Sequence, residues 1–293
     1  MKRLIILFLA ALFSLSGCST QQEPAQVAAT TLPVYEFTVQ LCDGTGITVT
    51  RLITESVSCL HDYSLNVSQV RAAEAAELVI ISGAGLEEFM EGMLPEESIL
   101  DSSAGIELIE CSDEHDHEDH DGHDHHHHEV DSHIWLSPEN AKQMAENICE
   151  GLSLRYPEHR ALFEANLQTL SENIDALQIY GEQALSTLSC RELITFHDGF
   201  SYLADCFGLT ILEAVEEESG SEASAAELKH LIEEVRHHDL PAIFTETNGS
   251  GSAASVIARE TGAAIHTLDM AMAGDSWFDA MYHNIDTIKE ALE

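Results

Sequence analysis

Basic residues are scarce in this sequence. Its 293 residues include 12 Lys and Arg against 52 Asp and Glu, which gives a formal net charge of −40 at pH 7. A surface this acidic repels phosphate groups, so nucleic acid and anionic phosphate ligands are excluded as partners, whereas cations are attracted. Because 44% of the residues are hydrophobic, the chain can still bury cores, and the acidity belongs to a folded surface.

Several patterns of catalytic and metal-cluster proteins are also missing. The chain contains neither HExxH nor GxSxG, and none of its seven cysteines has CxxC spacing. A zinc-dependent hydrolase is therefore the least favoured function, and we expect no enzyme. The six cysteines that follow Cys18 are an even number, so disulfides and free buried thiols both remain open, without an assigned pairing.

The N-terminus has the three parts of a secretory signal. Lys2 and Arg3 precede an apolar run at residues 4–12, which is too short to span a bilayer stably, and small residues lead to Cys18. The order Leu-Ser-Gly-Cys at 15–18 resembles a bacterial lipobox, although an ordinary signal followed by a chance cysteine would look similar. We expect a signal peptide at 1–17 and a lipidated Cys18 with a flexible tether at 18–29. The protein is then extracytoplasmic and lipid-anchored to the outer face of the bacterial cell membrane.

Short apolar runs alternate with helical patterns from about Val27 onward, which predicts α/β lobes with mainly parallel sheets flanked by helices. Strands are expected from about Val27 and at 47–53, 78–82, 192–195, 209–214, 242–245 and 263–267, and helices at 138–155, 225–237, 252–261 and 277–292. One long helical pattern covers 157–188 and is long enough to bridge two lobes. The expected domains are an N-terminal lobe at 30–156, this interlobe helix, and a C-terminal lobe at 189–293.

Residues 110–131 interrupt the first lobe. They hold eight histidines and ten acidic residues with no Lys or Arg, so they cannot form a core and are expected to be a solvated loop. The loop histidines form an expected low-affinity metal loop, although a dispensable insertion is an open alternative. They are His115, His117, His120, His123, His125, His126, His127 and His128.

Four residues near the ends of expected elements are the candidate metal ligands. His61, His197 and Asp269 follow expected strands, and ligands of open α/β sheets bind at the carboxyl ends of strands. His133 lies in the loop before a helix. Three imidazoles and one carboxylate complete a tetrahedral zinc set, and imidazole suits zinc better than manganese.

Taken singly, a histidine at the end of a strand is more often a hydrogen-bonded turn residue than a ligand. Glu246 and His266 also lie near strand ends and are possible alternatives to Asp269 as the fourth ligand. Asp62 and Asp198 adjoin candidate ligands and are candidates for orienting an imidazole.

Several separated motifs give the chain a family resemblance. They are TLPVYEF at 31–37, HDY at 61–63, IISGAGLE at 80–87, DSHIWLSP at 131–138, FHDGFSYL at 196–203, ETGA at 260–263 and TLD at 267–269. In this order they resemble the zinc and manganese solute-binding lipoproteins of ABC importers, in the zinc-binding type with a histidine-rich loop. The resemblance runs from about Ala28 to the C-terminus.

The resemblance implies two α/β lobes joined by a rigid helix, with metal ligands at His61, His133, His197 and Asp269. It further implies that the chain captures Zn²⁺ as cargo and delivers it to a cognate ABC permease. Manganese binders of the family often carry Glu at the third ligand position, so His197 favours Zn²⁺ over Mn²⁺. A manganese-preferring member, or a surface zinc buffer or adhesin without transport, stays as an alternative.

Two departures from the family pattern affect loops. Ser64-Leu65 stands where family members usually have Glu-Pro, and Met270 stands where a Pro usually follows the fourth ligand. The four ligand types are unaffected.

Overall fold

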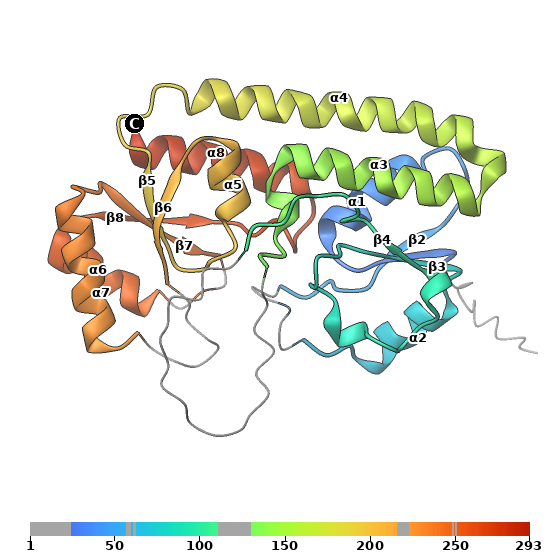
Figure 1. The fold of residues 1–293 in the computed structure, drawn as a ribbon, viewed down its shortest axis with the longest axis horizontal. Coiled ribbons are helices and arrows are strands. Elements are labelled where there is room, and N and C mark those ends of the chain that lie inside the picture. The colour runs from blue at the N-terminus through green and yellow to red at the C-terminus, as the bar shows by residue number, and fades with distance from the viewer. Residues whose placement is uncertain are drawn as a thin grey trace, which may run out of the picture.

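The computed structural model describes residues 25–56, 60, 63–110, 130–215, 223–247, 249 and 251–293. Within them, short apolar runs form two four-stranded parallel sheets (Figure 1). The first sheet has the order β2-β1-β3-β4, and its strands are β1 (Val27–Ala29), β2 (Val49–Arg51), β3 (Leu78–Ile81) and β4 (Ile99–Asp101). The β-branched and apolar side chains of β1 and β3 are almost entirely buried, as expected of strands covered on both faces.

The second sheet repeats this arrangement with the order β6-β5-β7-β8. Its strands are β5 (Glu192–Thr195), β6 (Thr210–Ala214), β7 (Ala242–Glu246) and β8 (Ala264–Leu268). In both sheets the strand neighbours are parallel, so all carboxyl ends of one sheet lie at the same edge.

Helices connect the strands, and side-chain caps fix where several of them begin. The helices are α1 (Leu32–Leu41), α2 (Val67–Ala75), α3 (Pro138–Arg155), α4 (Arg160–Ala184), α5 (Ser201–Cys206), α6 (Ala225–His237), α7 (Ser252–Thr261) and α8 (Trp277–Leu292). Ser137 caps α3 by accepting the Asn140 N–H, with Pro138 as the first helical residue. Asn66 and Ser224 form capping boxes with Gln69 and Glu227.

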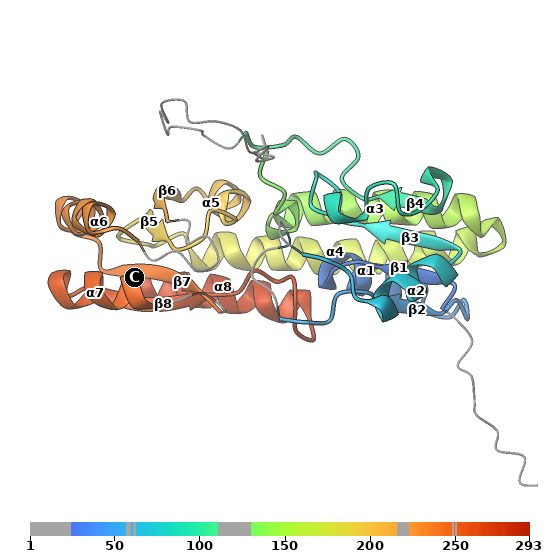
Figure 2. The same cartoon turned by 90° about the horizontal axis from the view of Figure 1, so that it is seen from below.

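Helix α4 joins the two lobes, as the sequence predicted. It packs on α1 and α3 of the first lobe and on α8 of the second, and Figure 2 shows the two sheets toward opposite ends of it. Its 25 residues span about 37 Å at about 1.5 Å per residue. The helix is shorter than the predicted 157–188, because Pro157–His159 forms a 3-10 turn and α4 ends at Ala184.

The lobes are also joined by hydrogen bonds to the connection between β8 and α8. The carbonyl oxygens of Met270, Met272 and Gly274 accept hydrogen bonds from Trp135 Nε1, Leu32 N and Arg51 Nη1 of the first lobe, at 2.8, 3.2 and 2.8 Å. At the start of α8, Glu36 accepts the Trp277 N–H at 2.5 Å, and Trp277 Nε1 donates to the Trp135 carbonyl at 3.1 Å. We call these five hydrogen bonds the lobe seam.

Some details differ from the sequence-based expectation. Strand β1 occupies Val27–Ala29 in the interior of the first sheet and is fully buried, so residues 27–29 belong to the first lobe and not to the expected tether at 18–29. Cys42, Cys149, Cys190 and Cys206 are free thiols, whereas Cys59 and Cys111 lie outside the described residues. None of the helices in the described part of the chain is long and apolar enough to cross a bilayer.

Candidate metal site

The carboxyl ends of the second sheet position three of the residues singled out from the sequence. His197 lies two residues after β5, Glu246 is the last residue of β7, and Asp269 directly follows β8. His133 comes from the first lobe, where it precedes a 3-10 turn at Ile134–Leu136 that leads into α3. Because parallel strands end at one edge, residues far apart in sequence meet where the two lobes adjoin.

The imidazole of His133 is buried and oriented by a neighbouring carboxylate. Its side chain is 4% exposed, and Nδ1 lies 2.8 Å from Asp131 Oδ1, which also accepts the His133 backbone N–H at 2.9 Å. An ionised carboxylate only accepts hydrogen bonds. This geometry fits the tautomer with the proton on Nδ1 and the lone pair on Nε2.

His133 and His197 face each other across the lobe boundary. Their Nε2 atoms are 3.3 Å apart, and the ring planes are nearly perpendicular at 88°. A Cβ on Gly199 would lie 2.8 Å from the His133 ring and 2.6 Å from Met270 Cε, so only glycine fits here without displacing neighbours. The absence of a side chain at Gly199 thus allows the two imidazoles to approach.

Glu246 lies on the other side of His197. Its Oε2 is 3.9 Å from His197 Nδ1, and its side chain is 7% exposed. The contact is therefore with the ring nitrogen that faces away from His133. This position suits a carboxylate that orients the imidazole better than a fourth ligand.

The carboxylate of Asp198 has a different position. Its Oδ1 is 4.0 Å from His197 Nε2, the nitrogen that faces His133, and it is more exposed than Glu246. Of the two acidic residues expected to orient an imidazole, Asp198 does not contact the orienting nitrogen in any described interaction, and Asp62 lies outside the described residues.

Asp269 is held by the backbone of the turn that follows β8. The buried Asn284 side chain of α8 accepts the Asp269 N–H at 2.7 Å and donates to its carbonyl at 2.7 Å. Asp269 Oδ1 accepts the N–H of Ala271 at 2.7 Å, and Ala271 has a φ of 53°. The alternative candidate His266 lies within β8, with its ring 6.2 Å from that of Phe244.

The other candidate residues lie outside the described residues. They are His61, the eight loop histidines within 111–129, and Cys18. In the ranges that the structure does describe, no three His, Cys, Asp or Glu side chains converge as a metal site. The structure thus brings His133 and His197 together and gives no position for His61.

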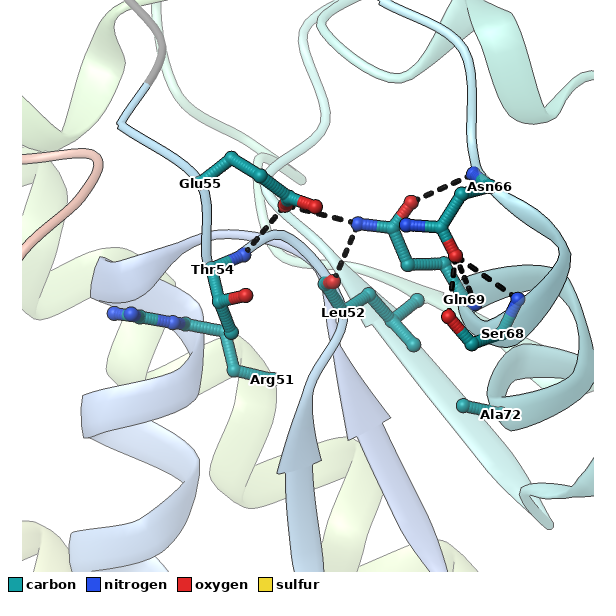
Figure 3. Close-up of a pocket in the computed structure, with 8 residues that line it drawn as sticks. All are labelled: Arg51, Leu52, Thr54, Glu55, Asn66, Ser68, Gln69 and Ala72. Carbon is teal, nitrogen blue, oxygen red and sulfur yellow. Dashed lines mark hydrogen bonds between the residues drawn. The ribbon is translucent and has the colours of Figure 1, made fainter.

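A hollow of about 240 Å³ lies at the carboxyl end of β2 (Figure 3) and contains no histidine or cysteine. Its wall includes Gln69, whose amide donates to the Leu52 carbonyl, to Glu55 and to the Tyr63 hydroxyl at 2.9, 3.0 and 2.7 Å. Glu55 and Tyr63 stand on either side of residues 57–62. Gln69 therefore ties together the two flanks of the segment that carries His61.

Asp131 is the site residue that the sequence analysis missed. The signal available was the Asp-Ser-His order at 131–133, since an Asp side chain often accepts the N–H two residues further on. That bond forms here, and it is what brings the carboxylate to the imidazole.

Two α/β lobes joined by one long helix, with polar side chains gathered where the lobes meet, define a two-lobed solute-binding protein. The chain belongs to the family described as zinc-uptake complex component A, periplasmic, whose model matches residues 27–291.

Individual relatives agree with this assignment. The chain is 30% identical to the high-affinity zinc uptake system protein ZnuA of Bacillus subtilis, over 94% of this chain and 90% of that protein. It is 29% identical to the zinc-binding lipoprotein AdcA of Streptococcus pneumoniae over 99% of this chain, and it spans about 60% of the length of that relative. A crystal structure of ZnuA matches with a TM-score of 0.76 and 28% identity, covering 92% of this chain and 100% of the other.

Proposed function

We propose that this chain captures Zn²⁺ between its two lobes and delivers it to the permease of an ABC importer. The proposed ligands are His61, His133, His197 and Asp269. Zinc is cargo, and the protein's task is to bind it tightly and release it to the partner.

The separation of the two imidazole nitrogens carries this proposal. Zinc lies about 2.0–2.1 Å from imidazole nitrogens in tetrahedral sites, which separates two such nitrogens by about 3.3–3.4 Å. The His133 and His197 Nε2 atoms are 3.3 Å apart. Since Asp131 accepts the hydrogen bond of His133 Nδ1, the Nε2 lone pair of His133 is available to a cation between the rings.

The surroundings of the pair also suit a cation. Buried carboxylates of Asp131 and Glu246 lie behind the two imidazoles and supply negative charge close to the site. Asp269 would provide the fourth ligand from the tightly held turn after β8, and His61 would come from the segment whose flanks Gln69 ties together.

The donor types favour zinc over manganese. Three imidazole nitrogens and one carboxylate oxygen suit Zn²⁺, whereas Mn²⁺ prefers sites richer in oxygen. The names of the relatives from Bacillus subtilis and Streptococcus pneumoniae agree, since both refer to zinc. The histidines of residues 115–128 would add weak sites that raise the local zinc concentration.

The proposed location is the outer face of the cell membrane, with the chain attached through lipid on Cys18. The name of the pneumococcal relative, a lipoprotein, supports this anchoring. Replacing Cys18 by Ala should move the protein from the membrane fraction to the soluble fraction after cell breakage, with zinc binding unchanged.

Competitive zinc titration of the purified protein tests the ligand assignment. A chromogenic chelator of known affinity should report one tight site, and manganese should compete poorly. His133→Ala and His197→Ala should each weaken that site by more than about 100-fold, the upper end of the effect of removing residues that only support a ligand. His230→Ala is the matched control, because His230 is an exposed histidine of α6 that contacts Glu213 of β6.

The results separate the tight site from the loop. Removing residues 112–128 should abolish weak binding and leave the tight site within about threefold. Tight zinc binding that survives the double change of His133 and His197 to Ala would overturn the ligand assignment. Stronger binding of manganese than zinc would instead assign the chain to the manganese-preferring alternative.

A further inference from the structure

Asp131 occupies an unusual position at the boundary between the two lobes. It is only 7% exposed, and a single oxygen, Oδ1, accepts hydrogen bonds from both the backbone N–H and the ring of His133. Its second oxygen, Oδ2, is buried and has no hydrogen-bond partner among the described residues. A buried carboxylate is costly unless its charge is compensated, so the compensation here depends on the His133 imidazole.

The backbone of Asp131 is fixed from two directions. Its N–H donates to the Ile109 carbonyl at 2.8 Å, next to the bridge between Glu110 and Val130. Its carbonyl accepts the Tyr202 hydroxyl at 3.0 Å, and the same hydroxyl accepts the Ile109 N–H at 3.0 Å. Tyr202 is buried in α5, five residues after His197, so one hydroxyl joins Asp131 to the helix that follows the facing imidazole.

We propose that Asp131 is a positioning residue for metal capture, and that Tyr202 holds it in place. The Asp131 carboxylate keeps His133 in the tautomer with the proton on Nδ1, so that Nε2 is unprotonated and faces His197 before any metal arrives. A metal on Nε2 withdraws electrons from the ring and strengthens the Nδ1–H bond to the carboxylate. Metal binding and the burial of this charge therefore stabilise each other. The expected effect of Asp131 on zinc affinity rests on the proposed function, whereas its expected effect on the His133 tautomer does not.

Glu246 provides an internal comparison. It is equally buried, but its Oε2 is 3.9 Å from His197 Nδ1, which is too long for a hydrogen bond. The orientation of His197 in the metal-free protein therefore depends less on Glu246 than that of His133 depends on Asp131. Glu246→Gln should accordingly weaken zinc binding less than Asp131→Asn.

The chain also contains a matched control at a distant place. Glu192 accepts a hydrogen bond from His238 Nδ1 at 2.9 Å, the same contact as Asp131 makes with His133. This pair lies at the amino end of β5, whereas His197 follows the carboxyl end of the same strand. Glu192→Gln thus removes a carboxylate–imidazole contact without touching the candidate site.

The test combines metal-free NMR with zinc titration. Long-range ¹H–¹⁵N spectra of the metal-free protein at pH 8 report which ring nitrogen of each histidine is protonated, and His133 is assigned by its absence from His133→Gln. We expect His133 wholly in the Nδ1–H form in the wild type and in Tyr202→Phe, and a mixture of tautomers in Asp131→Ala. Zinc should bind about 10–100-fold more weakly to Asp131→Asn, less than about tenfold more weakly to Tyr202→Phe, and equally to Glu192→Gln.

Each result decides a defined point. Wild-type His133 protonated at Nε2, or wild-type zinc affinity in Asp131→Asn, would overturn the proposal. If the Asp131 variants fail to fold, the wild-type spectrum alone still supports or refutes the tautomer. Absence of tight zinc binding in the wild type would instead refute the proposed function, because the spectrum is recorded without metal.

Discussion

Glu87 should make the stability of this protein fall as pH rises. Its side chain is 6% exposed, and it accepts hydrogen bonds from Thr30 Oγ1 and from the backbone N–H groups of Ser82 and Gly83, at 2.6, 2.8 and 3.0 Å. Burial raises the pKa of Glu87 from 4.5 to about 7, the three hydrogen bonds oppose that rise, and the charge of Asp101 adds to it. The carboxyl group therefore ionises at neutral pH inside the first lobe.

The sign and size of the effect follow from this difference in pKa. Between pH 4.5 and about pH 7 the folded state binds more protons at Glu87 than the unfolded chain does, so the free energy of unfolding decreases with rising pH. The contribution of Glu87 to the free energy of unfolding is fully present below pH 4.5 and is lost as pH rises through about 7. At about 1.36 kcal/mol per pH unit, the loss is about 3 kcal/mol.

Urea unfolding of the metal-free wild type and Glu87→Gln at pH 4.5 and pH 8 measures this loss. Glutamine cannot ionise, so the variant should gain about 3 kcal/mol relative to the wild type between the two pH values. At pH 4.5 the variant should be the less stable protein, because one amide oxygen cannot serve all three donors. Glu77→Gln, which removes an exposed carboxylate beside Arg155, is the control and should change the pH dependence by less than about 0.5 kcal/mol. Parallel pH dependences for the wild type and Glu87→Gln would refute this account.

Three further outcomes are expected. Gly199→Ala places a methyl group 2.6 Å from Met270 Cε and 2.8 Å from the His133 ring, so it should lower the free energy of unfolding by about 1–3 kcal/mol and weaken zinc binding, measured by urea unfolding and chelator competition. Asn284→Ala removes both hydrogen bonds to the Asp269 backbone and should cost about 2 kcal/mol in the same unfolding assay, with weaker zinc binding. Zinc should leave the radius of gyration from small-angle scattering unchanged, and a decrease typical of hinge closure would contradict the rigid arrangement of the lobes.

Local sequence signals predicted the regular elements best where a cap or a breaker marks the end. Helices α3, α6, α7 and α8 have the limits expected from the sequence, because Ser137, Ser224 and Ser276 each accept a hydrogen bond in the first turn and Gly262 ends α7 with φ of 86°. Helix α4 ends before the predicted residue, since Ser186 Oγ donates to the Gln183 carbonyl and competes with the next helical turn.

Elements that depend on a distant partner were harder to predict. Strand β4 comprises only Ile99–Asp101 and is defined by its pairing with β3. Three residues are too few to show the alternation of apolar and polar side chains that predicts a strand. Strand β1 begins where the sequence indicated a strand, at about Val27, but it overlaps the end of the expected tether at 18–29, because Ala28 and Ala29 resemble a linker in composition although both are fully buried between β2 and β3.

In the candidate site, too, features set by local sequence were predictable, whereas features set by contacts between distant segments were not. The positions of His197, Glu246 and Asp269 at strand ends followed from the alternation of strands and helices. The contact between His133 and His197 depends on how two lobes dock, which no local pattern encodes, and their role as metal ligands stays a prediction. Which carboxylates lie behind the imidazoles also depends on tertiary geometry, as Asp131 and Glu246 illustrate.

The lobe seam bears on how metal can enter and leave. Opening the lobes would break hydrogen bonds to the carbonyls of Met270, Met272 and Gly274 and would expose Trp135 and Trp277, which are fully buried. Opening would expose these groups to water, so each hydrogen bond counts only its net contribution of about 0.5–1.5 kcal/mol, and breaking the five would cost roughly 2.5–7.5 kcal/mol before the exposed indole surface is counted.

Asp269 is affected directly, because the seam begins at the residue that follows it. Asn284 fixes the Asp269 backbone to α8, while Trp135, two residues after His133, binds the Met270 carbonyl. The fourth proposed ligand and the first-lobe imidazole therefore move as one unit, although they belong to different lobes. With the proposed function, metal exchange would then use side-chain and loop movements around a fixed pair, and we expect a permease that extracts zinc to act on those movements rather than on the angle between the lobes.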